Sequence, residues 1–235
     1  MKIVFTPDWF LNNDILIDVI SFFILFVFFL FAVKGFKMTN KKSILYLGFG
    51  FLLIAVGELS TILTKLVLYY DTSITREIGR AVINSNLVPT VDIFYYAGFF
   101  FTKFLTLLGM YVIFKIPHIK KLSSEFLLII YLLFMVALFS QGIPFIYDLT
   151  ALTLLTLIVR NYSIIYRENE SRNTLILISV FSLLWISHLI FIFSNIGSLY
   201  IIAQSLQLVS YITMLFLIIR ILKNGKEEKP NRHSK

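Results

Sequence analysis

Seven apolar stretches, most of them about 20 residues long, dominate this sequence, and that is the length an α-helix needs to cross a bilayer. They fall at 14–33, 44–69, 92–114, 123–140, 143–166, 174–194 and 198–222. The composition agrees, because 58% of the residues are hydrophobic and only 14% are charged, whereas soluble chains carry about 25% charged residues. The sequence predicts an all-α, polytopic integral membrane protein with seven transmembrane helices.

The fourth stretch is the weakest of the seven. Its uninterrupted apolar part, from Phe126 to Phe139, is only 14 residues long. A helix of that length crosses a bilayer only where the bilayer is thin, or lies short and tilted within it. Six spans is therefore the alternative to seven.

The distribution of basic residues predicts the orientation. Sixteen of the 21 lysines and arginines fall in the loops after the first, third and fifth stretches, at the end of the fifth stretch, and in the C-terminal segment. Three lie on the opposite side, namely Lys2, Arg76 and Arg80. Because loops rich in Lys and Arg stay in the cytoplasm, we expect the N-terminus outside and the C-terminus inside, in the cell membrane.

Residues 1–222 form one predicted domain with a parallel repeat. Sliding the chain by 130 positions places Asp18 on Asp148 and Glu58 on His188. The first three and last three stretches also have matching orientations. We therefore expect a 3+1+3 plan, with repeats at 14–114 and 143–222, a connector helix at 123–140, and a basic, disordered cytoplasmic tail at 223–235.

Polar residues within the apolar stretches gather at one depth. Asp18, Glu58, His188 and Gln204 each lie 16 residues from a basic residue at the cytoplasmic rim. At about 1.5 Å per residue, that is about 24 Å from the rim, or roughly 6 Å below the outer edge of the hydrocarbon core. Charged groups inside a membrane are costly and usually face the protein interior. We expect these polar faces to converge on an outward-side pocket.

Eight residues make up the predicted pocket: Asp18, Glu58, Lys103, Asp148, His188, Gln204, Gln207 and Tyr211. The last three belong to a stripe that begins at Tyr200 and repeats at helical spacing along one face. Lys103 should pair with a carboxylate, Glu58 first and Asp18 second, or be neutral. For Asp14, Lys65 and Asp92, close to the outer rim, we expect interfacial solvation. The structural alternative is that the polar groups only hold helices together.

Several classes of protein are excluded or disfavoured. The chain has no cysteine, which rules out disulfides, zinc ribbons and thiol nucleophiles. With three histidines, of which His118 and His233 lie far from His188, we expect no metal site and no cofactor. No phosphate-binding, hydrolase or metalloprotease motif occurs. The basic residues form short clusters between apolar stretches, so we expect no nucleic-acid partner.

These features favour a protein that binds or transports a small polar or charged solute, with proton coupling as an option. Asp18 and Glu58 are the predicted proton or cation sites, and His188 is a predicted relay. The alternative is a receptor-like or accessory membrane subunit, and a membrane-embedded enzyme is less favoured. The expected partners are the lipid bilayer, a small solute or proton, and either a partner membrane subunit or a second copy of the chain.

Overall fold

The computed structural model describes residues 8–69, 90–116, 124–193 and 197–227, and this part of the chain is helical without any strand. A short 3₁₀-helix, η1 (Asp8–Phe10), precedes the first α-helix. The α-helices are α1 (Leu11–Thr39), α2 (Lys42–Tyr69), α4 (Thr90–Lys115), α5 (Ser124–Phe139), α6 (Phe145–Asn169), α7 (Arg172–Ile192) and α8 (Gly197–Glu227). The all-α prediction is confirmed.

Six of these helices are long and apolar enough to cross a membrane: α1, α2, α4, α6, α7 and α8. The fourth predicted span is α5, which has 16 residues and is too short to qualify by the same measure. At about 1.5 Å per residue it is about 24 Å long. The membrane character of the chain is therefore supported by six helices.

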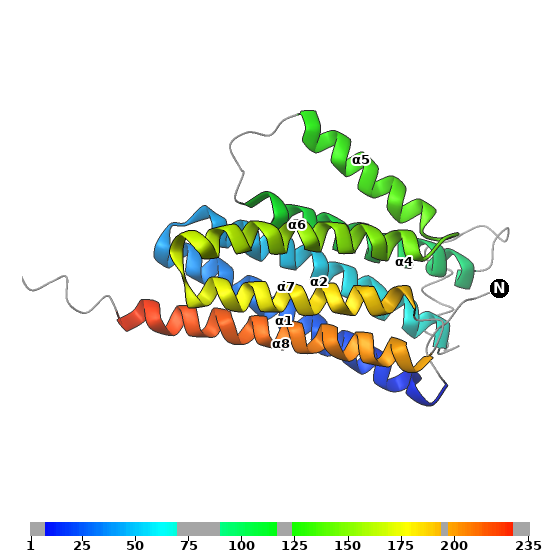
Figure 1. Ribbon diagram of the computed structural model, residues 1–235. Coiled ribbons are helices and arrows are strands. Elements are labelled where there is room, and N and C mark those ends of the chain that lie inside the picture. The colour runs from blue at the N-terminus through cyan, green and yellow to red at the C-terminus, as the bar shows by residue number, and fades with distance from the viewer. Residues whose placement is uncertain (1–7, 70–89, 117–123, 194–196, 228–235) are drawn as a thin grey trace, which may run out of the picture.

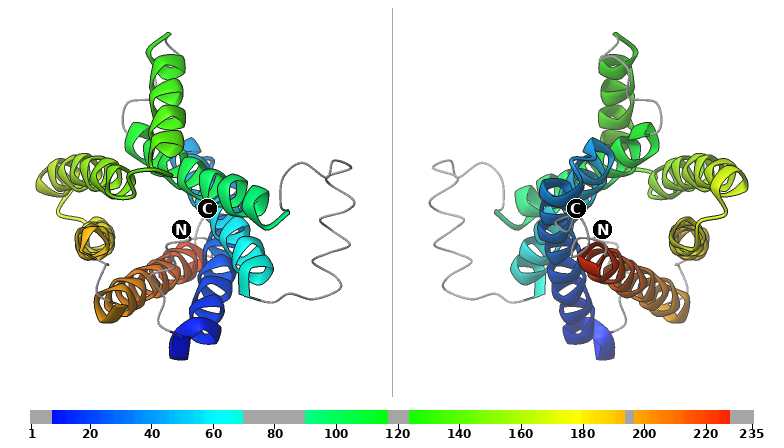
Figure 2. Two further views of the ribbon diagram at one scale, coloured as in Figure 1. Left: turned by 90° about the vertical axis from the view of Figure 1, so that its right-hand side faces the viewer. Right: turned by 90° about the vertical axis from the view of Figure 1, so that its left-hand side faces the viewer.

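The six long helices form a closed ring in the order α1, α2, α4, α6, α7 and α8, and α1 packs against α8 to close it. α5 lies outside the ring, against α4, and diverges from α6 along its length (Figures 1 and 2). We call the end of the ring where α1, α4, α6 and α8 begin the acidic end, since Asp14 and Asp148 lie there. The opposite end, where Lys42 and Arg172 begin α2 and α7, is the basic end.

Glycine allows a close contact between α2 and α4. A Cβ atom added to Gly109 would lie 2.5 Å from the carbonyl oxygen of Gly50, and one added to Gly50 would lie 2.9 Å from that of Gly109. Small residues let two helix backbones approach closely in a membrane protein. Thr102 uses this proximity, because its hydroxyl donates to the carbonyl of Gly57 at 3.1 Å. The crossing fixes α2 against α4.

Two tight connections at the basic end have the same geometry. Asn40 ends α1 with φ of 55° and Glu170 ends α6 with φ of 45°. Each donates its backbone N–H to the carbonyl four residues earlier, at 2.7 Å. α2 and α7 then begin two residues later in both cases. These left-handed caps turn each pair of helices into an antiparallel hairpin.

Aromatic side chains fill the middle of the ring. The rings of Phe51 on α2 and Phe181 on α7 stack with their centroids 6.3 Å apart. Phe28 packs against Phe51 at 4.8 Å, and Tyr162 packs against Phe181 at 5.6 Å. Both stacked phenylalanines are almost completely buried. We call these four residues the aromatic layer.

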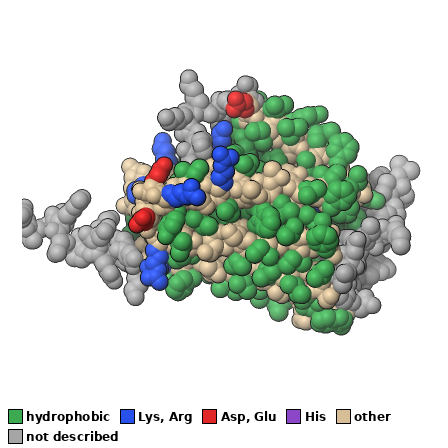
Figure 3. All heavy atoms as spheres, in the orientation of Figure 1, with side chains coloured by type: hydrophobic (Ala, Val, Ile, Leu, Met, Phe, Trp, Pro, Cys, Tyr) green, Lys and Arg blue, Asp and Glu red, His purple; other side chains and the backbone are tan. Residues whose placement is uncertain are grey.

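The outside of the ring is apolar. Many large hydrophobic side chains are exposed on α1, α5 and α8, among them Phe23, Leu127 and Phe216. On the face drawn in Figure 3, lysine and arginine side chains gather towards the basic end, and most of the remaining surface is hydrophobic. Such a surface is covered in a bilayer by lipid chains.

Two predicted segments lie partly or wholly beyond the described residues. α8 continues to Glu227, past the expected end of the last span at 222. The remainder of the predicted tail, 228–235, is outside the described part, as is the whole connection between α2 and α4, residues 70–89.

Candidate functional site

A buried ion cluster joins α1 and α2 at the acidic end. The ammonium of Lys65 donates to Asp14 Oδ1 at 2.7 Å and to Asp18 Oδ2 at 2.6 Å. The three residues are nearly inaccessible, with exposed fractions of 5% for Lys65, 0% for Asp14 and 6% for Asp18. A buried ammonium needs charged partners to offset its lost hydration. Lys65 finds them on the neighbouring helix.

α8 completes this cluster with two neutral side chains. Gln204 Nε2 donates to Asp14 Oδ1 at 2.6 Å and to Asp18 Oδ1 at 2.9 Å. The Tyr200 hydroxyl donates to Asp14 Oδ1 at 3.0 Å. The cluster thus ties α1 to α8, which is the contact that closes the ring. Gln204 and Asp18, predicted to lie at the same depth, are directly bonded.

The prediction of interfacial solvation for Asp14 and Lys65 is wrong. Lys65 lies 23 residues from Lys42, about 34 Å along α2, so depth alone placed it at the outer edge of the membrane. Side chains in an α-helix lean towards its N-terminus, however, and α2 begins at the basic end. The long lysine stem therefore carries the ammonium back into the ring, to the level of Asp18.

Glu58 lies two helical turns before Lys65 on α2 and has a different environment. It is 9% exposed, and its Oε1 accepts a hydrogen bond from Gln207 Nε2 at 3.2 Å. Gln207 also donates to the hydroxyl of Tyr211, at 2.8 Å. Glu58 interacts electrostatically with Asp18 and Lys65. Within the described residues it forms no ion pair of its own.

The predicted pair of Glu58 with Lys103 is not formed, and neither is the second choice, Asp18 with Lys103. Instead the Lys103 ammonium donates to the carbonyl oxygen of Ser140 at 2.9 Å and lies 5.9 Å from the ring centre of Tyr147. Asp148 is the acid that acts on it electrostatically. The reason is the direction of α4, which begins at the acidic end. Its side chains lean that way and carry Lys103 towards the loop that follows α5.

The other two predicted acid–base residues do meet. His188 Nδ1 on α7 lies 3.0 Å from Asp148 Oδ1 on α6, and both side chains are largely buried. An ionised Asp148 requires the proton of the imidazole to be on Nδ1. The His188 ring also packs edge-on against Tyr147, at 5.8 Å. Each half of the ring therefore has an acid on its first helix bonded to a base on its second.

The polar groups and the aromatic layer occupy successive levels of the ring. Glu58 lies seven residues from Phe51 on α2, and His188 lies seven residues from Phe181 on α7. Seven residues are two helical turns, or about 10 Å. The polar groups are on the acidic side of the stacked pair. We call Glu58, His188 and their hydrogen-bonded neighbours the polar layer.

All eight predicted site residues thus lie on helices of the ring, but they form three groups. Asp18 and Gln204 belong to the ion cluster. Glu58, Gln207 and Tyr211 form a second group, and Asp148 and His188 form a third, with Lys103 beside Tyr147. Sequence reasoning missed Lys65 as a member, although it shares a helix face with Glu58. That shared face was the available signal.

Nothing in the described part of the chain resembles a metal centre, because no three His, Asp or Glu side chains gather closely enough there to hold an ion. The described residues of the site offer hydrogen-bonding and charged groups. Carboxylates accept protons or cations, and amide and phenol groups orient a polar ligand.

No protein-family model, no curated protein and no solved structure matches this chain. The functional proposal therefore rests on the residues of the polar layer.

Proposed function

We propose that this protein binds and translocates a small polar or charged solute across the cell membrane, and that Glu58 takes up a proton or a monovalent cation in the process. The ring of helices encloses the path. The polar layer binds the solute, and the aromatic layer bars the way to the basic end. His188 relays protons, and Gln207 and Tyr211 orient the solute by hydrogen bonds.

One observation carries this proposal: Glu58 is a buried carboxyl group whose hydrogen-bond partner is a neutral amide. An ionised carboxylate in such a place is expensive unless a positive charge joins it. Lys65 is already held by Asp14 and Asp18. A purely structural role would favour a paired acid, as in that cluster. Glu58 is instead suited to bind and release an ion.

Several features at an offset of 130 residues support a repeat of three helices. The capping residues Asn40 and Glu170 are separated by this offset, and so are the first residues of α2 and α7. Phe51 and Phe181, also 130 apart, stack on each other. A residue near a twofold axis contacts its own counterpart. Parallel repeats related by an axis along the membrane normal are one way in which transporters are built.

The orientation is part of the proposal, with the N-terminus outside, the C-terminus inside, and α5 counted as a seventh, short span. Because the chain has no cysteine, single cysteines can report sidedness. We expect an impermeant thiol reagent to modify Gln141→Cys in intact cells and to spare Ser171→Cys until the cells are opened. The reverse pattern would overturn the orientation.

The binding step is tested by thermal unfolding of the purified protein across a panel of sugars, amino acids, organic acids and amines. We expect one solute class to raise the unfolding temperature of the wild type and of Glu125→Gln, a control variant that alters an exposed acid outside the ring. Glu58→Gln should lose most of that shift. An equal shift in Glu58→Gln would remove Glu58 from the site.

The alternative role, an accessory membrane subunit, gives a different result in the same experiment. It predicts no shift with any solute, and a membrane protein that stays bound through purification.

A further inference from the structure

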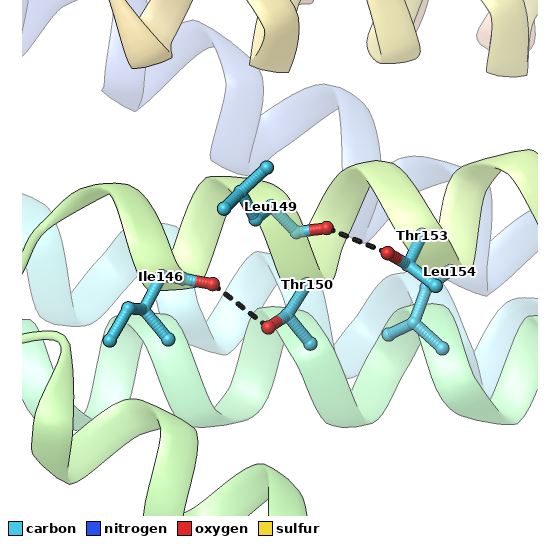
Figure 4. Close-up of a pocket in the computed structure, with 5 residues that line it drawn as sticks. All are labelled: Ile146, Leu149, Thr150, Thr153 and Leu154. Atoms are coloured by element: carbon cyan, nitrogen blue, oxygen red, sulfur yellow. Dashed lines mark hydrogen bonds between the residues drawn. The ribbon is translucent and has the colours of Figure 1, made fainter.

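A second feature lies outside the ring, where the structure has a hollow of about 340 Å³ on α6. Its lining comes from one face of that helix, at the spacing of successive turns: Ile146, Leu149, Thr150, Thr153 and Leu154 (Figure 4). The two threonine hydroxyls donate to carbonyls of their own helix, at 2.8 and 2.9 Å. Both hydroxyl hydrogens are therefore already bonded, and the surface of the hollow is mainly hydrocarbon.

We call the hollow of α6, together with the exposed Leu128 and Leu132 of the neighbouring α5, the wedge. α5 packs on α4 through Phe134, which meets Phe100 and Phe104 edge-on at 5.2 and 5.8 Å. It diverges from α6 towards the basic end (Figure 1). Leu128 and Leu132 of α5 remain exposed. The wedge between α5 and α6 therefore has apolar walls.

Two basic residues lie beyond the hollow in the direction of the basic end, on α6 and at the end of α4. Arg160 continues the face of α6 that lines the hollow, seven residues or about 10 Å beyond Thr153. It is exposed and has no ion-pair partner within the described residues. Asn161 donates to the carbonyl of Phe114 at 3.4 Å, so Lys115, the last residue of α4, lies at the same level as Arg160.

We propose that the wedge between α5 and α6 binds one anionic phospholipid, with an acyl chain along the hollow and the phosphate between Arg160 and Lys115. An apolar channel that ends at two cations matches a molecule with a hydrocarbon chain and a negative head group. The wedge also opens on the face that a bilayer covers. Glu125, an exposed acid in the first turn of α5, is the local opposing charge. The site does not depend on the proposed solute path.

The test uses a tryptophan in the hollow and brominated lipids, which quench tryptophan fluorescence on contact. The protein carries Leu149→Trp in a background without its two own tryptophans (Trp9→Phe, Trp185→Phe). It is reconstituted in phosphatidylcholine vesicles containing a small fraction of brominated phosphatidylglycerol or brominated phosphatidylcholine. The matched probe is Phe216→Trp, at an exposed position on α8.

We expect brominated phosphatidylglycerol to quench the Leu149→Trp probe much more strongly than brominated phosphatidylcholine, and both lipids to quench the Phe216→Trp probe equally. Arg160→Gln should weaken the preference about five-fold, since a basic residue near a membrane attracts anionic lipid by about that factor. Lys115→Gln added to it should abolish the preference. Arg220→Gln, at the basic end of α8, should leave it unchanged.

Three results would overturn the proposal. Equal quenching of the Leu149→Trp probe by both lipids means that the hollow meets only bulk lipid. A preference of the same size at Phe216→Trp, or one that survives the double substitution, means a general attraction to the basic end. Quenching by neither lipid means that protein covers the wedge, from a partner or from a second copy of the chain.

Discussion

The two lysines inside the ring, Lys65 and Lys103, are held in different ways. Lys65 lies between two carboxylates and is 5% exposed, whereas Lys103 is less buried and donates to a backbone carbonyl. Both stems lean towards the start of their own helix, but α2 and α4 run in opposite directions. The lean therefore carries Lys65 inwards and Lys103 outwards. The depth of a lysine along its helix therefore does not by itself predict which group its ammonium contacts.

The difference also separates structure from function. The Lys65 cluster joins α1, α2 and α8, and both of its carboxylates are bonded to an ammonium and to neutral donors, which suits a fixed joint. Glu58, two helical turns away on the same face of α2, lacks a cationic partner within the described residues, which suits exchange of an ion.

Lys65→Met should give the largest loss of stability, because it strands two buried carboxylates. Breaking a buried pair typically costs about 3 to 5 kcal/mol. Thermal or denaturant unfolding in detergent measures the loss. Replacing all three charges together (Asp14→Asn, Asp18→Asn, Lys65→Met) should recover much of it. If Lys65→Met unfolds like the wild type, the cluster is not the joint described above.

Gly109→Ala should give the second-largest loss of stability. The added Cβ would lie 2.5 Å from the Gly50 carbonyl oxygen and push apart α2 and α4, the helices that carry Lys65 and Lys103. Overpacking of this kind costs about 1 to 3 kcal/mol. Gly142→Ala is the matched control, because its nearest neighbour would be 3.8 Å away. Equal unfolding temperatures for the two variants would argue against the close crossing of α2 and α4.

Lys103→Met should cost less, about 1 kcal/mol, because Lys103 forms no ion pair within the described residues and loses a hydrogen bond to a carbonyl, a weak contact with the Tyr147 ring and a longer-range attraction to Asp148. The expected order of unfolding temperatures is wild type, Lys103→Met, then Lys65→Met. A loss as large as that of Lys65→Met would mean that Lys103 has a buried anionic partner after all.

The smallest effect is the coupling between Glu58 and Lys103. Since they form no pair, the losses from Glu58→Gln and Lys103→Met should add to within about 0.5 kcal/mol. A double-mutant cycle of unfolding free energies measures this. A double variant more stable than either single variant would indicate that Glu58 and Lys103 do form the pair that the sequence predicted.

The sequence predicted much of the fold, because hydrophobic length and helix periodicity are local properties. The positions of α1, α2 and α6–α8, the polar stripe of α8 and the weakness of the fourth span all follow from them, although α1 and α8 run past their expected ends at 33 and 222. The pairing of charges could not be predicted in the same way. Asp14 with Lys65, and Lys103 with Ser140, depend on which helices are neighbours and on which way each helix runs. Lys65 shares a helix face with Glu58, and this shared face indicated its buried position better than its depth along α2 did.

If Glu58 binds an exchangeable proton or cation, the stability of the folded protein should depend on that ion. Unfolding temperatures of the wild type, Glu58→Gln and Glu125→Gln would be measured across pH, and with sodium, potassium or choline as the salt. An ion that binds only the folded protein stabilises it by up to about 1.4 kcal/mol per tenfold rise in concentration. We expect such a dependence in the wild type and in Glu125→Gln, and its loss in Glu58→Gln. The same dependence in all three proteins would contradict it.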